Sequence, residues 1–170
     1  MPTFPLADGS EVRIRPIRPD DKQLLSDGLA HLSPETVYRR FLSPKPSFTR
    51  GELRYLTEVD GCDHFALVAT LPGPERIVGV ARMVRLAGDP RSAEVAVVVA
   101  DSLQGQGLGR ELATRIADEA RARGIGRFQA TFLSSNVPAR RLMERIAERV
   151  AAGPPQGATV ELTADLVRAA

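Results

Sequence analysis

A glycine-rich turn between a predicted strand and a predicted helix constrains this chain more than any other feature. The turn reads Gln104-Gly105-Gln106-Gly107-Leu108-Gly109. Before it, residues 95–100 read Val-Ala-Val-Val-Val-Ala, a β-branched apolar run that predicts a buried strand. After it, residues 110–123 predict an amphipathic helix, since apolar side chains recur every four residues from Leu108 to Ala120. A strand that enters a helix through glycines presents unpaired N–H groups at the positive end of the helix dipole, which is an anion site.

The spacing of the glycines decides which phosphate-binding loops fit. A dinucleotide fingerprint that starts at Gly105 and Gly107 would need a third glycine where Arg110 stands. A Walker loop ends in Gly-Lys-Ser/Thr, and this turn holds no lysine. The pattern that fits is Gln-x-x-Gly-x-Gly, formed by Gln104, Gly107 and Gly109. The alternative is a flexible turn that binds nothing, which the strand–loop–helix setting disfavours.

The order of the predicted elements indicates a mixed α/β (α+β) fold with a central, mostly antiparallel sheet flanked by helices. We expect a single domain that covers residues 1–170. The chain begins with a hairpin, because Asp8-Gly9 is a strong turn signal. The other expected strands are 64–70, 77–86, 93–100, 127–133 and 158–166, and the expected helices are 20–32, 34–41, 49–60, 110–123 and one that starts at Asn136.

The Gln104, Gly107 and Gly109 pattern resembles the pyrophosphate-binding loop of the GNAT acetyltransferase superfamily, which grips the diphosphate of acetyl-CoA. The predicted order of elements matches the GNAT order over nearly the whole chain. Residues 13–21 and 32–41 resemble more narrowly the GNAT domains of bacterial protein-lysine acetyltransferases. The resemblance implies an acetyl-CoA-dependent N-acetyltransferase whose acceptor is a protein lysine or a small-molecule amine. A non-catalytic acyl-CoA-binding sensor or regulatory domain is the second hypothesis.

The resemblance also implies roles for residues around the glycine turn. The pantetheine arm of acetyl-CoA would pair, like an added strand, with the backbone of Val97 and Val99. Residues 104–110 would hold the diphosphate through their main-chain N–H groups. Arg110 would add positive charge there, or would lie on the helix surface in water.

Glu94 is the candidate general base, because a glutamate at this place in the family takes the proton from the amine. We expect partial burial near the cofactor to raise its pKa. The alternative is a structural carboxylate paired with Arg82 or Arg91. Asp63 and His64 are weaker candidates, and the ordinary pKa of a histidine lies close to neutral pH.

The helix that starts at Asn136 holds three further positions of interest. Asn136 stands where many family members contact the pantetheine arm, and it would also cap the helix. Arg140 lies one turn further along the same face and would reach the cofactor. Met143 stands where many relatives place the tyrosine that protonates the leaving thiolate, so the general acid is unassigned.

Two other segments bear on the acceptor. Ile146-Ala147-Glu148 replaces the Leu-Gly-Phe usual after this helix, which puts the final strands and the acceptor pocket in question. Tyr38 to Phe41 lie where the family places its acceptor-site helices, and they either shape specificity or pack. Cys62 is expected to be a turn residue, because GNAT transfer is direct and needs no thiol nucleophile.

Composition narrows the remaining classes. With 43% hydrophobic and 26% charged residues, the chain resembles an ordinary soluble protein. We expect no membrane segment, no signal segment and, from the single cysteine, a cytoplasmic location. The histidines and the cysteine lack metal-site spacing, so no metal is expected. Interleaved charges, a net charge of +2 and 5% aromatic residues argue against nucleic acid as a partner. The sequence leaves monomer and homodimer open.

Overall fold

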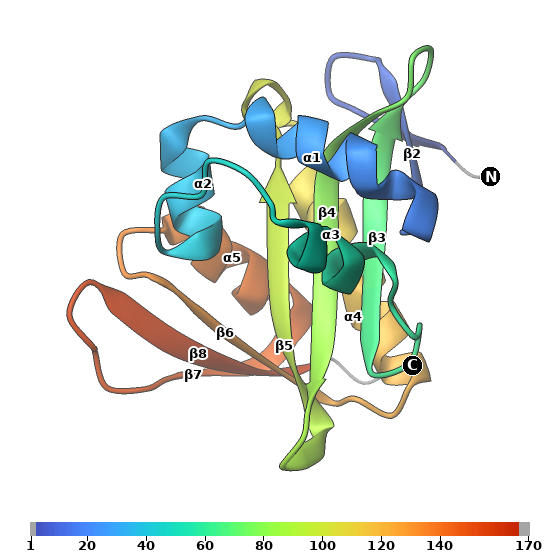
Figure 1. The fold of residues 1–170 in the computed structure, drawn as a ribbon. Coiled ribbons are helices and arrows are strands. Elements are labelled where there is room, and N and C mark those ends of the chain that lie inside the picture. The colour runs from blue at the N-terminus through green and yellow to red at the C-terminus, as the bar shows by residue number, and fades with distance from the viewer. Residues whose placement is uncertain (1–2, 167–170) are drawn as a thin grey trace.

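Eight strands form one mixed sheet at the centre of the computed structural model, which describes residues 3–166 (Figure 1). Their order across the sheet is β1-β2-β3-β4-β5-β6-β8-β7. Every neighbouring pair is antiparallel except β5 and β6, which run parallel. The predicted fold class is therefore confirmed. The strands are β1 (Thr3–Pro5), β2 (Glu11–Pro16), β3 (His64–Leu71), β4 (Arg76–Leu86), β5 (Asp89–Val99), β6 (Arg127–Leu133), β7 (Ala147–Ala152) and β8 (Thr159–Leu166).

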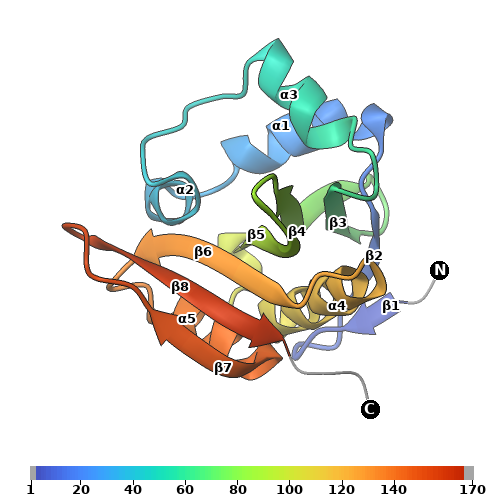
Figure 2. The same ribbon diagram turned by 90° about the horizontal axis from the view of Figure 1, so that it is seen from below.

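Helices cover both faces of the sheet (Figure 2). On one face lie α1 (Lys22–Ala30), α2 (Pro34–Phe41) and α3 (Arg50–Thr57), and on the other lie α4 (Leu108–Ala122) and α5 (Val137–Ile146). No helix within residues 3–166 has the length and apolar character that crossing a membrane requires.

Local capping explains where the short helices begin. The Ser33 side chain accepts the N–H of Thr36 at the start of α2, and Thr49 and Glu52 form the capping box of α3. The sequence predicted α3 to continue to Asp60, but the helix ends at Thr57. The Asp60 carboxylate instead accepts the N–H groups of residues 62–64, each at 2.9 Å, and so forms the turn that leads into β3.

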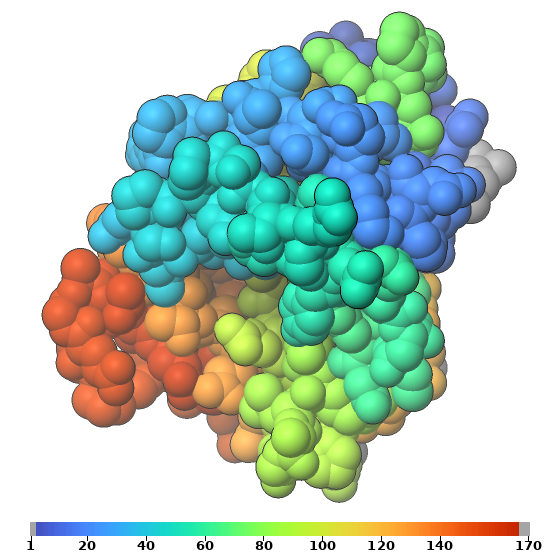
Figure 3. Space-filling view, in the orientation of Figure 1, coloured from blue at the N-terminus to red at the C-terminus, as the bar shows by residue number. Residues whose placement is uncertain are grey.

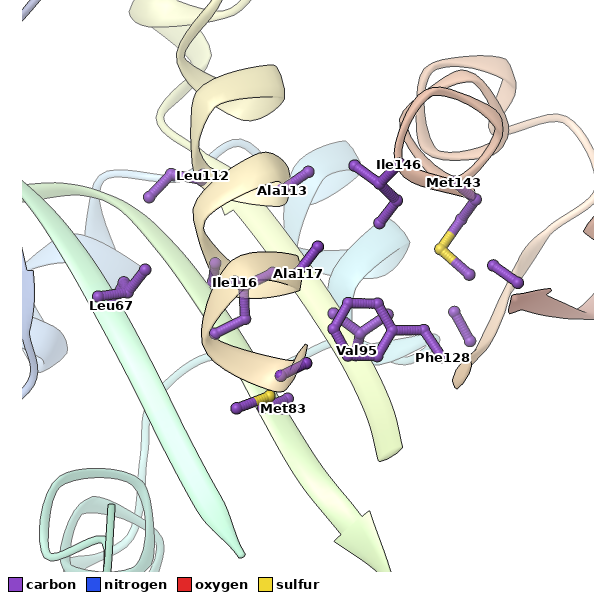
Figure 4. Close-up of a cluster of buried hydrophobic side chains, with 14 of the residues drawn as sticks. Leu67, Met83, Val95, Leu112, Ala113, Ile116, Ala117, Phe128, Met143 and Ile146 are labelled. Atoms are coloured by element: carbon purple, nitrogen blue, oxygen red, sulfur yellow. The ribbon is translucent and has the colours of Figure 1, made fainter. Parts of the chain in front are cut away.

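The main hydrophobic core lies between the sheet and helices α4 and α5. Its α4 contribution is the predicted apolar face, with Leu112 and Ile116 fully buried (Figure 4). Those side chains belong to one buried cluster with Met83 and Val95 from the sheet. Gly79 on β4 permits this close approach, because a Cβ there would lie 2.9 Å from Leu112 Cδ1.

Strand β7 was missed by the sequence analysis. Helix α5 passes directly into it, and it pairs with β8 from Ala147↔Leu166 to Ala152↔Leu162. Its side chains are exposed or half-buried alanines, charged residues and one valine, so no apolar alternation predicts a strand here. This edge strand is held mainly by its backbone pairing. The altered Ile146-Ala147-Glu148 segment therefore leaves the final strands in place.

A buried ion pair joins the end of β2 to the start of α1. Arg15 donates two hydrogen bonds of 2.8 Å to the Asp21 carboxylate, and both side chains are nearly inaccessible. Burial alone would raise the pKa of Asp21, but hydrogen bonds from Arg15 and from the Arg18 N–H outweigh it and lower that pKa. Glu75 also accepts from Arg15 at 3.0 Å, which ties the β3–β4 turn to the same point.

We expect Asp21→Asn or Arg15→Met to lower the free energy of unfolding by about 3–5 kcal/mol, because each leaves a buried charge without its partner. Urea unfolding at neutral pH measures the loss. Arg13→Met, at an exposed position on the same strand, is the matched control and should change stability by about 0.5 kcal/mol or less. A loss in the Asp21 variant no larger than that of the control would contradict the assignment.

Candidate active site

Strands β5 and β6 separate part of the way along the sheet. They pair only from Ser92↔Arg127 to Glu94↔Gln129, whereas β5 stays paired with β4 as far as Gly79↔Val99. Beyond Glu94, β6 leans away from β5 (Figure 1). The edge of β5 over residues 95–99 therefore faces a gap with no strand neighbour.

The backbone groups that face this gap belong to the predicted residues. The Ala100 N–H donates to the Val78 carbonyl on β4 at 2.8 Å. In an antiparallel pair, alternate residues point their N–H and C=O groups toward the partner strand. Val97 and Val99 therefore point theirs away from β4 and into the gap. The Val99 carbonyl accepts from Gln104 Nε2, and an extended ligand chain would pair with the remaining groups. Their half-buried side chains pack against the main core, as the sequence analysis expected.

A cavity of about 90 Å³ occupies the gap, and we call it the gap cavity. It brings together Val97 on β5, Asn136 at the start of α5 and Met143 on α5. The buried Met143 side chain carries no proton to donate, so the general acid stays unassigned. The full lining of the gap cavity is Arg39, Arg40, Val95, Ala96, Val97, Ala113, Ile116, Ala130, Thr131, Phe132, Asn136, Ala139, Leu142, Met143 and Ile146.

The glycine turn lies at the end of β5 with its main-chain donors unused. Gly105 and Gly107 have φ angles of +80° and +90°, conformations that favour glycine, and Gly107 is the N-cap of α4. The Gln104 N–H donates to the Asp101 carbonyl and the Glu111 N–H to the Gly107 carbonyl. Between them, the N–H groups of residues 105–110 make no hydrogen bond with any described residue. A diphosphate fits this set of donors.

The side chains of the turn hold it in place. Gln104 Nε2 donates to the Val99 carbonyl at 3.0 Å, and Gln106 Oε1 accepts the N–H of Asp8 at 3.3 Å. Leu108 is buried in the core. Arg110 is exposed and has no ion pair within residues 3–166. Any ligand binding by residues 104–109 would therefore fall to the backbone, whereas the Arg110 side chain would be available to add charge.

The two predicted positions on α5 differ in their surroundings. Asn136 Oδ1 accepts the N–H of Ala139 at 3.3 Å, and the side chain also lines the gap cavity, so one residue caps the helix and faces the site. Arg140 is exposed, its Nε donates to Glu144 at 3.3 Å, and it does not line the cavity. Contact between Arg140 and the cofactor stays a prediction.

Glu94 stands at the last paired position of β5, where the gap begins. The expected partial burial is wrong, because the side chain is exposed. Its neighbours Val95 and Val97 pack toward α4, so alternation along the strand places Glu94 on the opposite face, with α1, α2 and α3. It forms no ion pair with Arg82 or Arg91 in the described residues, since Arg82 is engaged by other groups.

His64 is the partner of Arg82. Arg82 Nη1 donates to His64 Nε2 at 2.7 Å and to the Leu56 carbonyl at 2.9 Å. Burial and the positive charge of Arg82 lower the pKa of His64 to about 4, so the ring is neutral at physiological pH. The expectation of titration near neutrality is wrong, and the ring nitrogen that a base would use is already occupied. Cys62 lies exposed in the turn between α3 and β3 and does not line the gap cavity.

A second cavity of about 430 Å³ lies under α1 and the segment that joins α2 to α3, and we call it the helix-face cavity. That segment crosses the front of the molecule (Figure 3). Arg82 lines this cavity, and Arg40 lines both this and the gap cavity. From the sequence, Arg40 was expected either to shape acceptor specificity or to pack, and Arg82 was considered only as a partner for Glu94. A charged residue among apolar neighbours within a predicted strand is itself a sign of a functional side chain, and Arg82 shows this pattern.

Free backbone amides at a helix start, an unpaired strand edge and a carboxylate beside it define a protein that binds an extended phosphate-bearing ligand at a group-transfer site. No three His, Cys, Asp or Glu side chains gather as a metal site in the described part of the chain. The chain belongs to the acetyltransferase (GNAT) family, whose family model matches residues 34–147.

Individual relatives agree with this assignment. The chain is 42% identical over 96 residues to the acetyltransferase Pat of Mycolicibacterium smegmatis, a match that covers 56% of this chain and only 28% of the relative. The crystal structure of the GNAT domain of S. lividans PAT is 31% identical, with a TM-score of 0.86 and coverage of 97% of this chain and 96% of that one.

A third comparison bears on the fold alone. The yncA protein of Salmonella typhimurium, solved with its cofactor acetyl-CoA, is 23% identical with a TM-score of 0.74 and coverage of 94% and 96%. Membership of the acetyltransferase (GNAT) family confirms the predicted enzyme class, a GNAT-type acyltransferase, for which acetyl-CoA is the predicted co-substrate.

Gly107→Val should weaken acetyl-CoA binding about tenfold or more, or ~1.4 kcal/mol, because a β-branched side chain at positive φ distorts the turn. Isothermal titration calorimetry with CoA measures the change. Gly157→Val, in a turn with φ of +62° outside both cavities, is the control for backbone strain alone. Equal affinity of the Gly107 variant and wild type would remove the turn from the binding site.

Stability should fall by about 2 kcal/mol between pH ~7 and pH ~5 through His64. Its folded pKa lies below its unfolded value, so the unfolded chain takes up a proton below about pH 6.5 that the folded chain refuses until about pH 4. Urea unfolding at the two pH values measures the loss. His64→Gln, which cannot titrate, should lose correspondingly less, and an equal loss in both proteins would contradict the neutral, buried ring.

Proposed function

We propose that this chain moves the acetyl group of acetyl-CoA directly onto a primary amine, with Glu94 as the general base, and that residues 1–170 act as one domain. One observation carries the proposal. The unused amides of residues 105–110 end the same strand whose free edge begins at Glu94. Cofactor phosphates, thioester and base would thereby lie in order along one strand.

Each part of the site has a separate task. The amides of residues 105–110 would bind the diphosphate, and the backbones of Val97 and Val99 would align the pantetheine arm. Main-chain N–H groups on that free edge would also stabilise negative charge on the thioester oxygen. Asn136 would contact the arm from α5. Alignment of this kind converts a reaction between two molecules into one within a single complex.

The proposed reaction balances with groups that are present. The amine nitrogen forms a bond to the acetyl carbon, and the carbon–sulfur bond breaks. Glu94 accepts the proton that the amine releases, directly or through water. Its exposed position keeps it open to both the acceptor and solvent. Because Met143 cannot donate a proton, the leaving thiolate takes one from water, which the modest pKa of a thiol permits.

A non-catalytic acyl-CoA-binding sensor is the second candidate function. The observation in its favour is the buried Met143 at the position of the usual tyrosine acid. Such a protein would bind acetyl-CoA through the same backbone donors but transfer nothing. As the acceptor of an active enzyme, a protein lysine is supported by the resemblance of the N-terminal segments to protein-lysine acetyltransferases, and a small amine by the helix-face cavity of about 430 Å³.

Glu94→Gln should reduce kcat about 100-fold or more, because the amide keeps the shape but accepts no proton at neutral pH. Its affinity for acetyl-CoA should stay within about twofold of wild type, since the diphosphate is held elsewhere. CoA release and calorimetry give the two readouts, and Glu11→Gln, exposed on β2, is the control. Binding of acetyl-CoA with no transfer by wild-type protein to any amine would favour the sensor.

A further inference from the structure

The helix-face cavity is apolar around most of its wall. Its inner surface is formed by side chains of α1, β4 and β5 and by two phenylalanines that flank the segment between α2 and α3. At about 430 Å³ it is large enough for a small-molecule ligand. The apolar part of the lining consists of Leu24, Leu25, Leu29, Leu32, Phe41, Phe48, Leu56, Leu71, Ile77, Val78, Val80, Val98 and Ala100.

Arg40 sits at the junction of this cavity with the gap cavity, since it lines both. Its guanidinium makes no hydrogen bond or ion pair with any described residue. It stacks on the Phe41 ring, with Cζ 4.8 Å from the ring centroid. Burial lowers the pKa of Arg40, and the negative charge of Glu94 opposes that effect. Arg40 is therefore a partly desolvated cation beside the candidate base.

Arg82 directs a second guanidinium into the same cavity. Only its Nη1 is engaged, by His64 and by the Leu56 carbonyl. Within residues 3–166, no fully buried side-chain nitrogen lacks a hydrogen-bond partner. The Nε and Nη2 atoms of Arg82 have no such partner, so they are not fully buried, and Arg82 lines the cavity.

No carboxylate in the cavity wall neutralises these two cations. Glu75 is bound by Arg15, and Asp101 accepts hydrogen bonds from Ser33 and Thr36. Asp27 is exposed at the rim. Burial and the nearby charge of Arg40 lower the pKa of Arg82 to about 10, which still leaves it protonated at neutral pH. An anion between the two guanidiniums would relieve both the desolvation and the repulsion.

We propose that the helix-face cavity binds the acetyl acceptor and selects a small amine that carries a carboxylate on an apolar body, such as an apolar amino acid. The carboxylate binds Arg40 and Arg82, and the apolar side chain fills the space under α1. The amine then lies near Glu94, because Glu94 is close enough to Arg40 for their charges to interact. This inference rests on the transfer activity proposed above and adds the chemical class of the acceptor.

The arrangement also assists the chemistry of the acceptor. A free amino acid carries a protonated amine at neutral pH, and only the neutral amine attacks a thioester. Two guanidinium charges close by favour the neutral amine, while their attraction for the carboxylate keeps the molecule bound. The same groups disfavour a lysine side chain, which brings a positive charge with no carboxylate beside it.

Paired acceptors that differ only in the carboxylate test the inference. Acetyl transfer from acetyl-CoA by the full chain is measured as CoA release with L-leucine against 3-methylbutylamine, and with L-phenylalanine against 2-phenylethylamine. A lysine-containing peptide is the third arm. We expect kcat/KM for each amino acid to exceed that for its decarboxylated partner about tenfold or more. A wild-type preference for the decarboxylated amines or for the peptide would overturn the acceptor class.

Variants of Arg40 connect that preference to the cavity. Arg40→Met should bring the ratio of kcat/KM between an amino acid and its decarboxylated partner close to one, mainly through a higher KM for the amino acid. Arg40→Lys should restore part of the preference for the amino acid. Arg54→Met, exposed on α3, is the control and should keep the wild-type ratio. An unchanged ratio in Arg40→Met would exclude Arg40 from carboxylate recognition.

A binding measurement separates this inference from the proposed activity. N-acetyl-L-leucine, the expected product, is titrated into the protein with CoA present, and binding is followed by nuclear magnetic resonance. Arg40-dependent binding without transfer to any amine would refute the catalytic proposal and leave the carboxylate site standing. Transfer to amines without such binding would support the catalytic proposal and refute the carboxylate site.

Discussion

The separation of β5 from β6 is the constraint on which the rest of the site depends. Backbone N–H and C=O groups within a sheet need partners, and the gap withholds them from Val97 and Val99 along one edge of β5. Gln104 Nε2 supplies a partner for the Val99 carbonyl, and water or an extended ligand must supply the others. Because the strand stays fully paired with β4, the free edge is held rigidly in a position that a loop would not maintain.

Strand β5 also separates the two faces of the sheet on which the two cavities lie. Residues that alternate along β5 point either to the core under α4, beside the gap, or to the face under α1, α2 and α3. Helix α2 spans the two sides through Arg40. It is fixed to the end of β5 by Asp101, which accepts hydrogen bonds of 2.7 Å from the hydroxyls of Ser33 and Thr36. Gln104 also reaches Thr36, at 3.3 Å, so the glycine turn and α2 are positioned together.

Local sequence rules accounted for most of the elements because their signals lie within a few residues. The Thr49 capping box, the Ser33 cap and the apolar face of α4 each appear where the pattern predicts them. The misses have a common cause. Strand β7 is held by pairing with a distant strand, and the exposure of Glu94 and the low pKa of His64 depend on neighbours far along the chain, such as Arg82.

The sequence by itself determined the glycine turn, since positive φ angles and close backbone approach need glycine wherever the turn lies, and it thereby determined the family. Only the tertiary structure decided where β5 and β6 separate, that Glu94 is exposed, and that Arg40 and Arg82 line one cavity without an ion pair to a carboxylate of its wall. The physical reason is that dihedral preferences are properties of single residues. Burial, desolvation and the pairing of charges are properties of groups that only folding brings together.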